Sequence, residues 1–192
     1  MASDPLDHLG RLFLREHGFV IGRDKTSPAL NLKKSRLEIA NAVSEIGKSG
    51  NLDLILAVEQ RFLENDQAQY ANSPAMKRSL ETAMAELHSA QRHTAMVDDP
   101  KRYRAVDGSH SLPKNRKAGL PYDEARQFFN SHAARLLNMD KSRLDAEEKK
   151  IVDLRKSNMR TADKLYADRQ RKTLGIEVAQ KPQRGLGLGM GR

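Results

Sequence analysis

Apolar residues recur along most of the chain at spacings of three and four, the pattern of helices that bury one face. This spacing predicts about six helices, over residues 5–18, 28–47, 52–70, 74–97, 121–138 and 146–174. One of the clearest stripes also contains an acid, and its members are Leu52, Ile55, Leu56, Glu59, Phe62 and Leu63. We therefore expect an all-α, multi-helix bundle with a long C-terminal helix and a flexible basic tail.

Several expected helices carry recognisable start and stop signals. Ser73-Pro74 combines a capping residue with a proline at the first helical position. Asp145 and Glu148 match the capping-box spacing, and Gly175 follows the last residue of the same helical pattern. These signals predict one uninterrupted C-terminal helix between Asp145 and Gly175.

The pattern divides the chain into four regions. Residues 1–97 are expected to form an N-terminal helical bundle and residues 122–175 a C-terminal helical region. Residues 98–121 contain three prolines and no clear apolar face, so we expect an irregular basic loop or linker. Such a long loop usually marks a functional segment or a domain boundary. Residues 176–192 are rich in glycine and are expected to be disordered.

The last helix raises the question of a partner. A helix of about 30 residues is roughly 45 Å long, more than the N-terminal half is expected to cover. Ile151, Leu154 and Leu165 on its apolar stripe are candidates for docking a partner protein or a second copy of the chain. Asn158 within that stripe either fixes the register of the pairing, as buried polar residues do in coiled coils, or faces the edge of the stripe.

Composition narrows the class of protein. Hydrophobic residues make up 38% of the chain and charged residues 31%, which indicates a lean core of the kind that helices can build. The absence of cysteine excludes disulfides, cysteine-ligated zinc and thiolate nucleophiles. The first residues lack the pattern of a secretory signal, and no apolar run approaches the ~20 residues of a membrane span. We expect a cytoplasmic protein that does not enter the membrane.

No motif in the chain indicates catalysis. His88 and His93 are five residues apart, which places them on different sides of a helix and argues against a metal pair. Asp98 and Asp99 could supply carboxylates, but acids before a proline are typical of a turn at a helix end. The final glycine-rich run has no helix after it, so it is not a phosphate-binding loop. We expect no enzymatic activity, no catalytic residue, no metal and no cofactor.

The positive charge is unevenly distributed. The net charge is +9, of which residues 98–121 carry +3 and residues 169–192 carry +5, whereas residues 1–97 are neutral. Lysine and arginine in such segments can neutralise phosphates, and a tyrosine among them can stack on an unpaired base. Nucleic acid is therefore the expected partner. Tyr103 is the stacking candidate, and the phosphate-binding candidates are Lys101, Arg102, Arg104, Lys114, Arg116, Lys117, Arg169, Arg171 and Lys172.

Other interpretations fit the same residues. The basic loop and tail could be solvated segments that only increase solubility, or they could contact an acidic protein. The chain could also be a helical adaptor or a secreted effector that docks through its last helix. A third alternative is an enzyme whose catalytic residues are dispersed along the sequence.

Residues 120–170, LPYDEARQFFNSHAARLLNMDKSRLDAEEKKIVDLRKSNMRTADKLYADRQ, resemble helical accessory regions of plasmid mobilisation proteins and relaxases. This similarity covers about a quarter of the chain. The catalytic motifs of that family, a cluster of metal-binding histidines beside a nucleophilic tyrosine, are absent. The resemblance therefore implies an accessory role in mobile-element DNA transfer, without strand-nicking activity.

Overall fold

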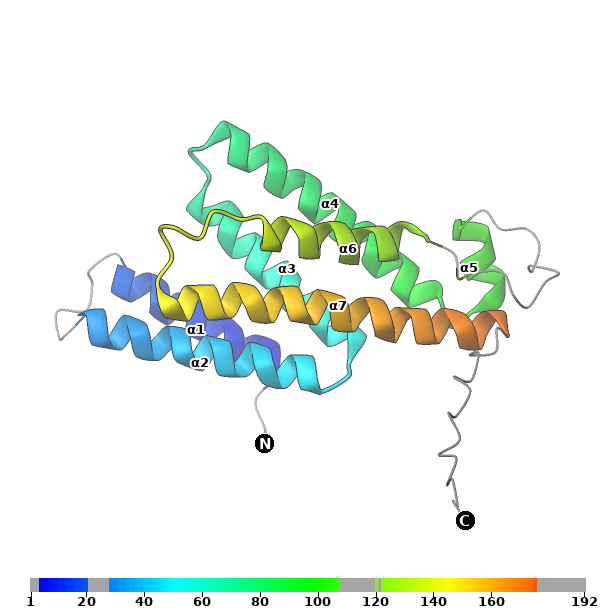
Figure 1. Cartoon of the computed structure of the whole chain (residues 1–192), viewed down its shortest axis with the longest axis horizontal. Coiled ribbons are helices and arrows are strands. Elements are labelled where there is room, and N and C mark those ends of the chain that lie inside the picture. The colour runs from blue at the N-terminus through cyan, green and yellow to red at the C-terminus, as the bar shows by residue number, and fades with distance from the viewer. Residues whose placement is uncertain (1–3, 21–27, 108–119, 121, 176–192) are drawn as a thin grey trace, which may run out of the picture.

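A computed structural model of the chain describes residues 4–20, 28–107, 120 and 122–175, and these residues form helices joined by turns, without a strand (Figure 1). The all-α class and the long C-terminal helix are confirmed. The helices are α1 (Pro5–Val20), α2 (Pro28–Lys48), α3 (Leu52–Gln69), α4 (Pro74–Met96), α5 (Pro100–Asp107), α6 (Glu124–Leu137) and α7 (Ala146–Leu174).

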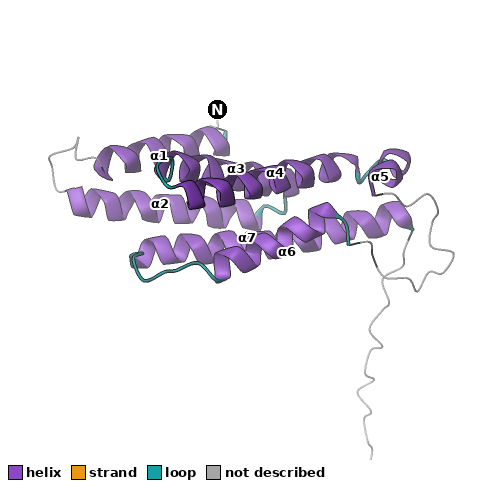
Figure 2. Cartoon of the chain, turned by 90° about the horizontal axis from the view of Figure 1, so that it is seen from above, coloured by secondary structure: helices purple, strands orange, loops and turns teal. Residues whose placement is uncertain are grey.

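The longest helix, α7, runs along the length of the molecule. It packs beside α2 and α6 and also contacts α3, while α6 packs on α4 (Figure 1). Seen from above, α6 and α7 lie on one side of the molecule and α1 and α3 on the other, with α5 at one end (Figure 2). The N-terminal and C-terminal helical regions therefore share one core.

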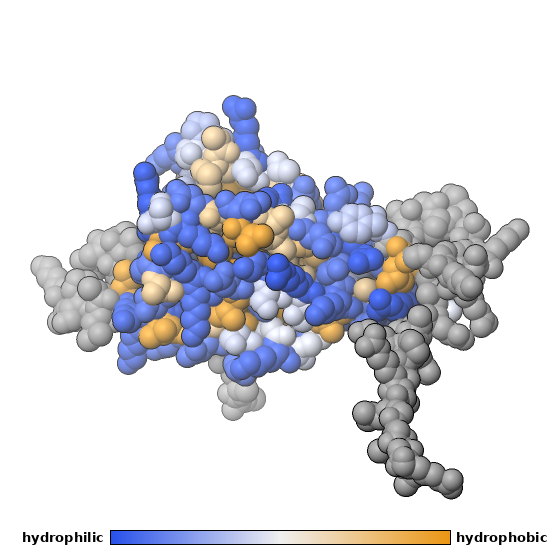
Figure 3. All heavy atoms as spheres, viewed as in Figure 1, coloured by the Kyte–Doolittle hydropathy of each residue, from blue (hydrophilic) through white to orange (hydrophobic). Residues whose placement is uncertain are grey.

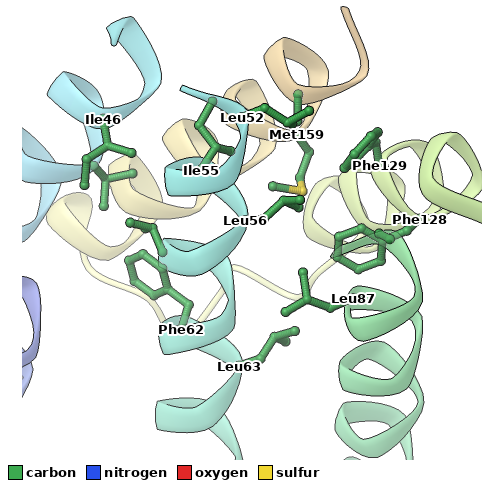
Figure 4. Packing of buried hydrophobic residues seen from close by; sticks show 14 of the residues in the cluster. Ile46, Leu52, Ile55, Leu56, Phe62, Leu63, Leu87, Phe128, Phe129 and Met159 are labelled. Carbon is green, nitrogen blue, oxygen red and sulfur yellow. The ribbon is translucent and has the colours of Figure 1, made fainter. Parts of the chain in front are cut away.

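The apolar stripes of all these helices meet in that core. Leu56 of α3, Leu87 of α4, Phe128 of α6 and Met159 of α7 are almost completely buried within the same cluster (Figure 4). Burying a large apolar side chain of this kind contributes roughly 1.5–3 kcal/mol each. Helices distant in the sequence are held together mainly by these contacts.

The helix ends follow the start and stop signals in the sequence. Asp145 accepts a hydrogen bond from the backbone N–H of Glu148, whose side chain accepts one from the N–H of Asp145, so the capping box is present. Gly175 ends α7 with a φ of 63°, a left-handed conformation that glycine adopts without strain. Both ends of the longest helix are therefore fixed locally.

Two expectations about helix boundaries were wrong. α1 continues through Gly18 to Val20, because glycine inside a helix is only mildly unfavourable. Residues 100–107 form α5, although we expected the whole basic segment to be irregular. The side chain of Asp99 accepts hydrogen bonds from the N–H groups of Lys101 and Arg102, and Pro100 occupies the first position, so a cap and a proline start this helix too.

The polar residue in the stripe of α7 pairs within the chain. Asn158 is buried, and its side-chain N–H donates to the backbone carbonyl of Val43 on α2 at 3.2 Å. A Cβ atom on Gly47 of α2 would lie 2.1 Å from the Asn158 Oδ1 atom, so only glycine allows this close approach. Asn158 thus fixes the register of α2 against α7.

Candidate nucleic-acid interface

Two of the basic segments meet at one end of the molecule. The side chain of Gln170 on α7 donates to the Tyr103 hydroxyl of α5 at 2.6 Å, and Thr173 donates to the backbone carbonyl of Val97 at 2.6 Å. These hydrogen bonds place α5 against the C-terminal end of α7 (Figure 1). We call the surface formed by residues 98–107 and 169–175 the basic end.

A half-buried carboxylate anchors this arrangement. Asp123 caps α6 by accepting from the N–H of Arg126, and its Oδ2 atom accepts from the hydroxyls of Tyr103, at 2.9 Å, and Tyr166. Burial, reinforced by this carboxylate, raises the pKa of the Tyr166 hydroxyl, which therefore remains a donor. One aspartate links α5, α6 and α7.

Tyr103 is not available for stacking on a base. Its side chain is 0% exposed, and burial raises the pKa of its hydroxyl well above the ordinary value. The prediction that this tyrosine stacks on nucleic acid is therefore wrong. Because residues 100–107 form a helix, the ring of Tyr103 turns into the core while Lys101 and Arg102 remain exposed.

The described cations of the basic end lie at the surface, and three of them have acidic neighbours. Arg102 lies 3.5 Å from Asp99, Arg169 lies 3.9 Å from Asp53, and Arg171 lies 2.6 Å from Asp168. Exposed pairs of this kind contribute about 0–1 kcal/mol, so a phosphate can replace the acid. The other two, Lys101 and Lys172, are exposed and form no ion pair with another described residue. The side chain of Arg104 lies outside the described residues, as do Lys114, Arg116 and Lys117.

An aromatic residue that we did not select lies near the basic end. Tyr122 is 61% exposed, directly before the cap of α6, and the guanidinium of Arg126 lies 5.7 Å from its ring centroid. Arg126 is itself held by Asp163 through an Nε–Oδ1 hydrogen bond of 2.9 Å. The signal in the sequence is its position between Pro121 and a helix cap, outside any apolar stripe. Unlike Tyr103, Tyr122 therefore presents an exposed aromatic ring.

The proposed docking residues of α7 are used inside the chain. Ile151 is only 8% exposed and belongs to the core, so the prediction that it docks a partner is wrong. Leu154 and Leu165 are half-buried and pack against the same core. The reason is that α2 and α6 cover the stripe, whereas we expected part of it to remain uncovered.

Glu59 lies on the apolar face of α3, and its hydrogen-bonding partners cannot be identified from the sequence. Its carboxylate accepts from the Arg155 guanidinium, with an Nε–Oε1 distance of 3.1 Å, and lies 2.7 Å from the His132 Nε2 atom. Burial alone would raise the pKa of this carboxyl, but the charge of Arg155 and the hydrogen bond with His132 lower it to about 2. Glu59 is 2% exposed, so a substrate cannot reach this cluster, and we assign it to stability.

Two other features, clusters of possible metal ligands and a surface groove, do not add a candidate site. No group of three or more acids and histidines that could hold a metal occurs among the described residues. An open groove of about 520 Å³ lies between α1 and α3, lined by Leu6, Phe13 and Leu14 beside the exposed Arg61–Glu64 pair. It does not contain any of the candidate residues.

Comparisons with protein-family models, with curated proteins and with solved structures found no match to this chain. The structure itself defines an all-α helical bundle in which α7, the longest described helix, packs against α2, α3 and α6. Within the part of the chain that the structure describes, no helix combines the length and the apolar character that crossing a membrane requires.

Proposed function

We propose that this protein binds nucleic acid through its basic end and has no enzymatic role. The observation that carries the proposal is the convergence of charge. Residues 98–121 hold +3 and residues 169–192 hold +5 of the net +9, and the hydrogen bonds of Tyr103 and Thr173 bring the described parts of these two segments together.

The physical basis is phosphate neutralisation. Each lysine or arginine that meets a phosphate releases counterions, and this release drives the association. Lys101 and Lys172 have no ion pair to give up among the described residues, and Arg102 and Arg171 exchange a weak one. Tyr122 offers an exposed ring to an unpaired base.

DNA is the nucleic acid to test first. The resemblance of residues 120–170 to accessory regions of plasmid mobilisation proteins supports an accessory role in mobile-element DNA transfer, in the cytoplasm. The alternative of an adaptor that docks through α7 has less support, because Ile151 is buried within the chain.

The test is a titration of nuclease-treated protein against a labelled 20-base-pair duplex and a labelled single strand, followed by fluorescence anisotropy. With 6–10 phosphate contacts, affinity is expected to fall by about 10³–10⁵ between 50 and 200 mM salt. The basic-end variant carries four substitutions: Lys101→Gln, Arg102→Gln, Arg169→Gln and Lys172→Gln. A control variant loses the same charge from the opposite end and α4: Lys34→Gln, Lys77→Gln, Arg78→Gln and Arg143→Gln.

We expect the basic-end variant to bind at least tenfold more weakly than the control at 100 mM salt. Equal binding by the two variants, or wild-type affinity that does not depend on salt, would overturn the proposal.

A further inference from the structure

The outward face of α7 carries a row of basic side chains. Members of this row, which we call the α7 row, are separated by 7, 4, 4 and 7 residues and are Lys149, Lys156, Arg160, Lys164 and Arg171. These spacings keep the side chains on one side of a helix that has 3.6 residues per turn. The 22 residues from first to last correspond to about 33 Å along the axis. Hydrophilic side chains dominate this face of the molecule (Figure 3).

The acids near the row are already neutralised. Asp153 contacts the Nζ atoms of Lys141, at 3.1 Å, and Lys156, at 3.2 Å. Asp168 contacts Arg171. The remaining cations of the row form no ion pair with another described residue; they are Lys149, Arg160 and Lys164. Lys150 and Lys172 add two further exposed cations on the same helix.

Acids at the edges of α7 also form ion pairs with cations of other helices. Asp163 holds Arg126, Glu147 lies 3.6 Å from Lys33, and Glu148 lies 3.0 Å from the Arg36 guanidinium. Every acid of α7 therefore has a cationic partner among the described residues, and the outward face has a net positive charge.

This row is held in a fixed position. The capping box at Asp145 and the salt bridges of Arg36 secure the first turn of α7, and the hydrogen bond from Thr173 to Val97 secures the last. Cations on such a helix lose less conformational freedom on binding than cations on an irregular segment.

We propose that a nucleic-acid duplex lies against the outward face of α7, with its phosphates on the α7 row. This inference rests on the proposed function and extends it, because Arg171 belongs both to the row and to the basic end. The length of the row matches one helical turn of a duplex, about 34–36 Å, so the row can reach phosphates on both sides of a groove.

A duplex fits this face better than a single strand. Proteins that bind single strands present aromatic rings on which bases stack. The only aromatic residue of α7 is Tyr166, and it is 0% exposed. The row therefore offers charge at fixed intervals without a stacking surface, which suits phosphate contacts along a base-paired helix.

The test compares two variants that lose the same charge. Arg160→Gln with Lys164→Gln removes two members of the row, and Lys77→Gln with Arg78→Gln removes two exposed, unpaired cations from the first turns of α4. All four residues are at the surface, so both variants are expected to fold. Each phosphate contact adds about 0.9 to the slope of log affinity against log salt.

For the row variant, we expect this slope to decrease by about 2 with a 20-base-pair duplex, while the α4 variant keeps the wild-type slope. A 12-base-pair duplex should bind wild-type protein more tightly than a 6-base-pair duplex, which covers only part of the row, and more tightly than a 12-nucleotide single strand.

The outcomes separate the two proposals. If the wild type binds with a steep salt dependence but the row variant keeps its slope, the duplex does not lie on α7 and only the proposed function stands. If the single strand binds as tightly as the duplex, the inference is also overturned. If the wild type ignores nucleic acid but binds polyglutamate through Arg160 and Lys164, both proposals are wrong and the partner is an acidic protein.

Discussion

Glu59 carries a negative charge in the core, and the substitution Glu59→Gln removes that charge with little change in size. Arg155 would then lose the charge of its closest partner while both side chains remain buried. The pKa of Glu59 is lowered from an ordinary value of 4.5 to about 2, which corresponds to about 3 kcal/mol of stability at neutral pH.

The pH dependence follows from the direction of this shift. A carboxyl whose pKa is lower in the folded state stabilises the fold above its unfolded pKa, and that contribution is lost as pH falls through the folded pKa. We therefore expect Glu59→Gln to be about 3 kcal/mol less stable than wild type at pH 7. The difference should shrink to about 1 kcal/mol at pH 3.

Urea unfolding followed by far-ultraviolet circular dichroism measures these differences between pH 7 and pH 3. For a chain of this size, about 3 kcal/mol corresponds to a melting temperature lower by roughly 6–12 °C. Glu64→Gln is the control, because Glu64 lies on the same helix but is partly exposed, where it pairs with Arg61 and accepts a hydrogen bond from Gln60. It should cost less than about 1 kcal/mol.

Replacing both charged residues adds a second readout. Glu59→Leu combined with Arg155→Met removes both buried charges, so it should be more stable than Glu59→Gln alone, even though Asp66 loses its contact with Arg155 and His132 loses its contact with Glu59. The reasoning fails if Glu59→Gln and Glu64→Gln are equally stable at pH 7, or if the gap between Glu59→Gln and wild type is the same at pH 7 and pH 3.

Three further substitutions test single contacts by the same unfolding assay. Gly47→Ala should destabilise the fold by about 1–3 kcal/mol, because its Cβ would meet the Asn158 amide. Gly10→Ala is its control and should stabilise the fold by about 0.5–1 kcal/mol, because the space around Gly10 is open. If Gly47→Ala were the more stable of the two variants, the packing of Gly47 against Asn158 would be contradicted. Tyr103→Phe should cost about 1–3 kcal/mol and speed hydrogen exchange in α5, and unchanged exchange would show that its hydroxyl does not hold α5. Asp145→Ala should cost about 0.5–2 kcal/mol, and no loss would mean that the capping box contributes nothing.

Local signals in the sequence predict most of the helices. The Asp145–Glu148 capping box and Gly175 each act within a few residues and mark a helix end as expected. Ser73-Pro74 also marks the start of α4, but the Ser73 side chain forms no capping hydrogen bond, so the expected cap is absent and only the proline is in its expected position. The combination of Asp99 and Pro100 is the same kind of signal. We did not apply it, because the charge and the prolines of the following segment favoured a loop.

Contacts between distant residues could not be predicted in this way. Nothing near Glu59 indicates that its counter-ion is Arg155, because that pairing depends on how α3 and α7 pack. The burial of Tyr103 likewise depends on Asp123 and Gln170, which come from two other helices. The candidate basic residues follow from composition, but only the fold shows that Lys101 and Arg102 lie at the same end of the molecule as the last turns of α7.

The pairing of Glu59 with Arg155 has a consequence for synthesis on the ribosome. The two residues are 96 positions apart, which at 5–20 residues per second means that roughly 5–20 s pass between their translation. Until then α3 exposes an apolar face with an uncompensated charge in its centre, and closing that face over the charge is costly. The N-terminal helices are therefore expected to pack stably only after α7 has been synthesised. Until then, the nascent chain should need protection from aggregation.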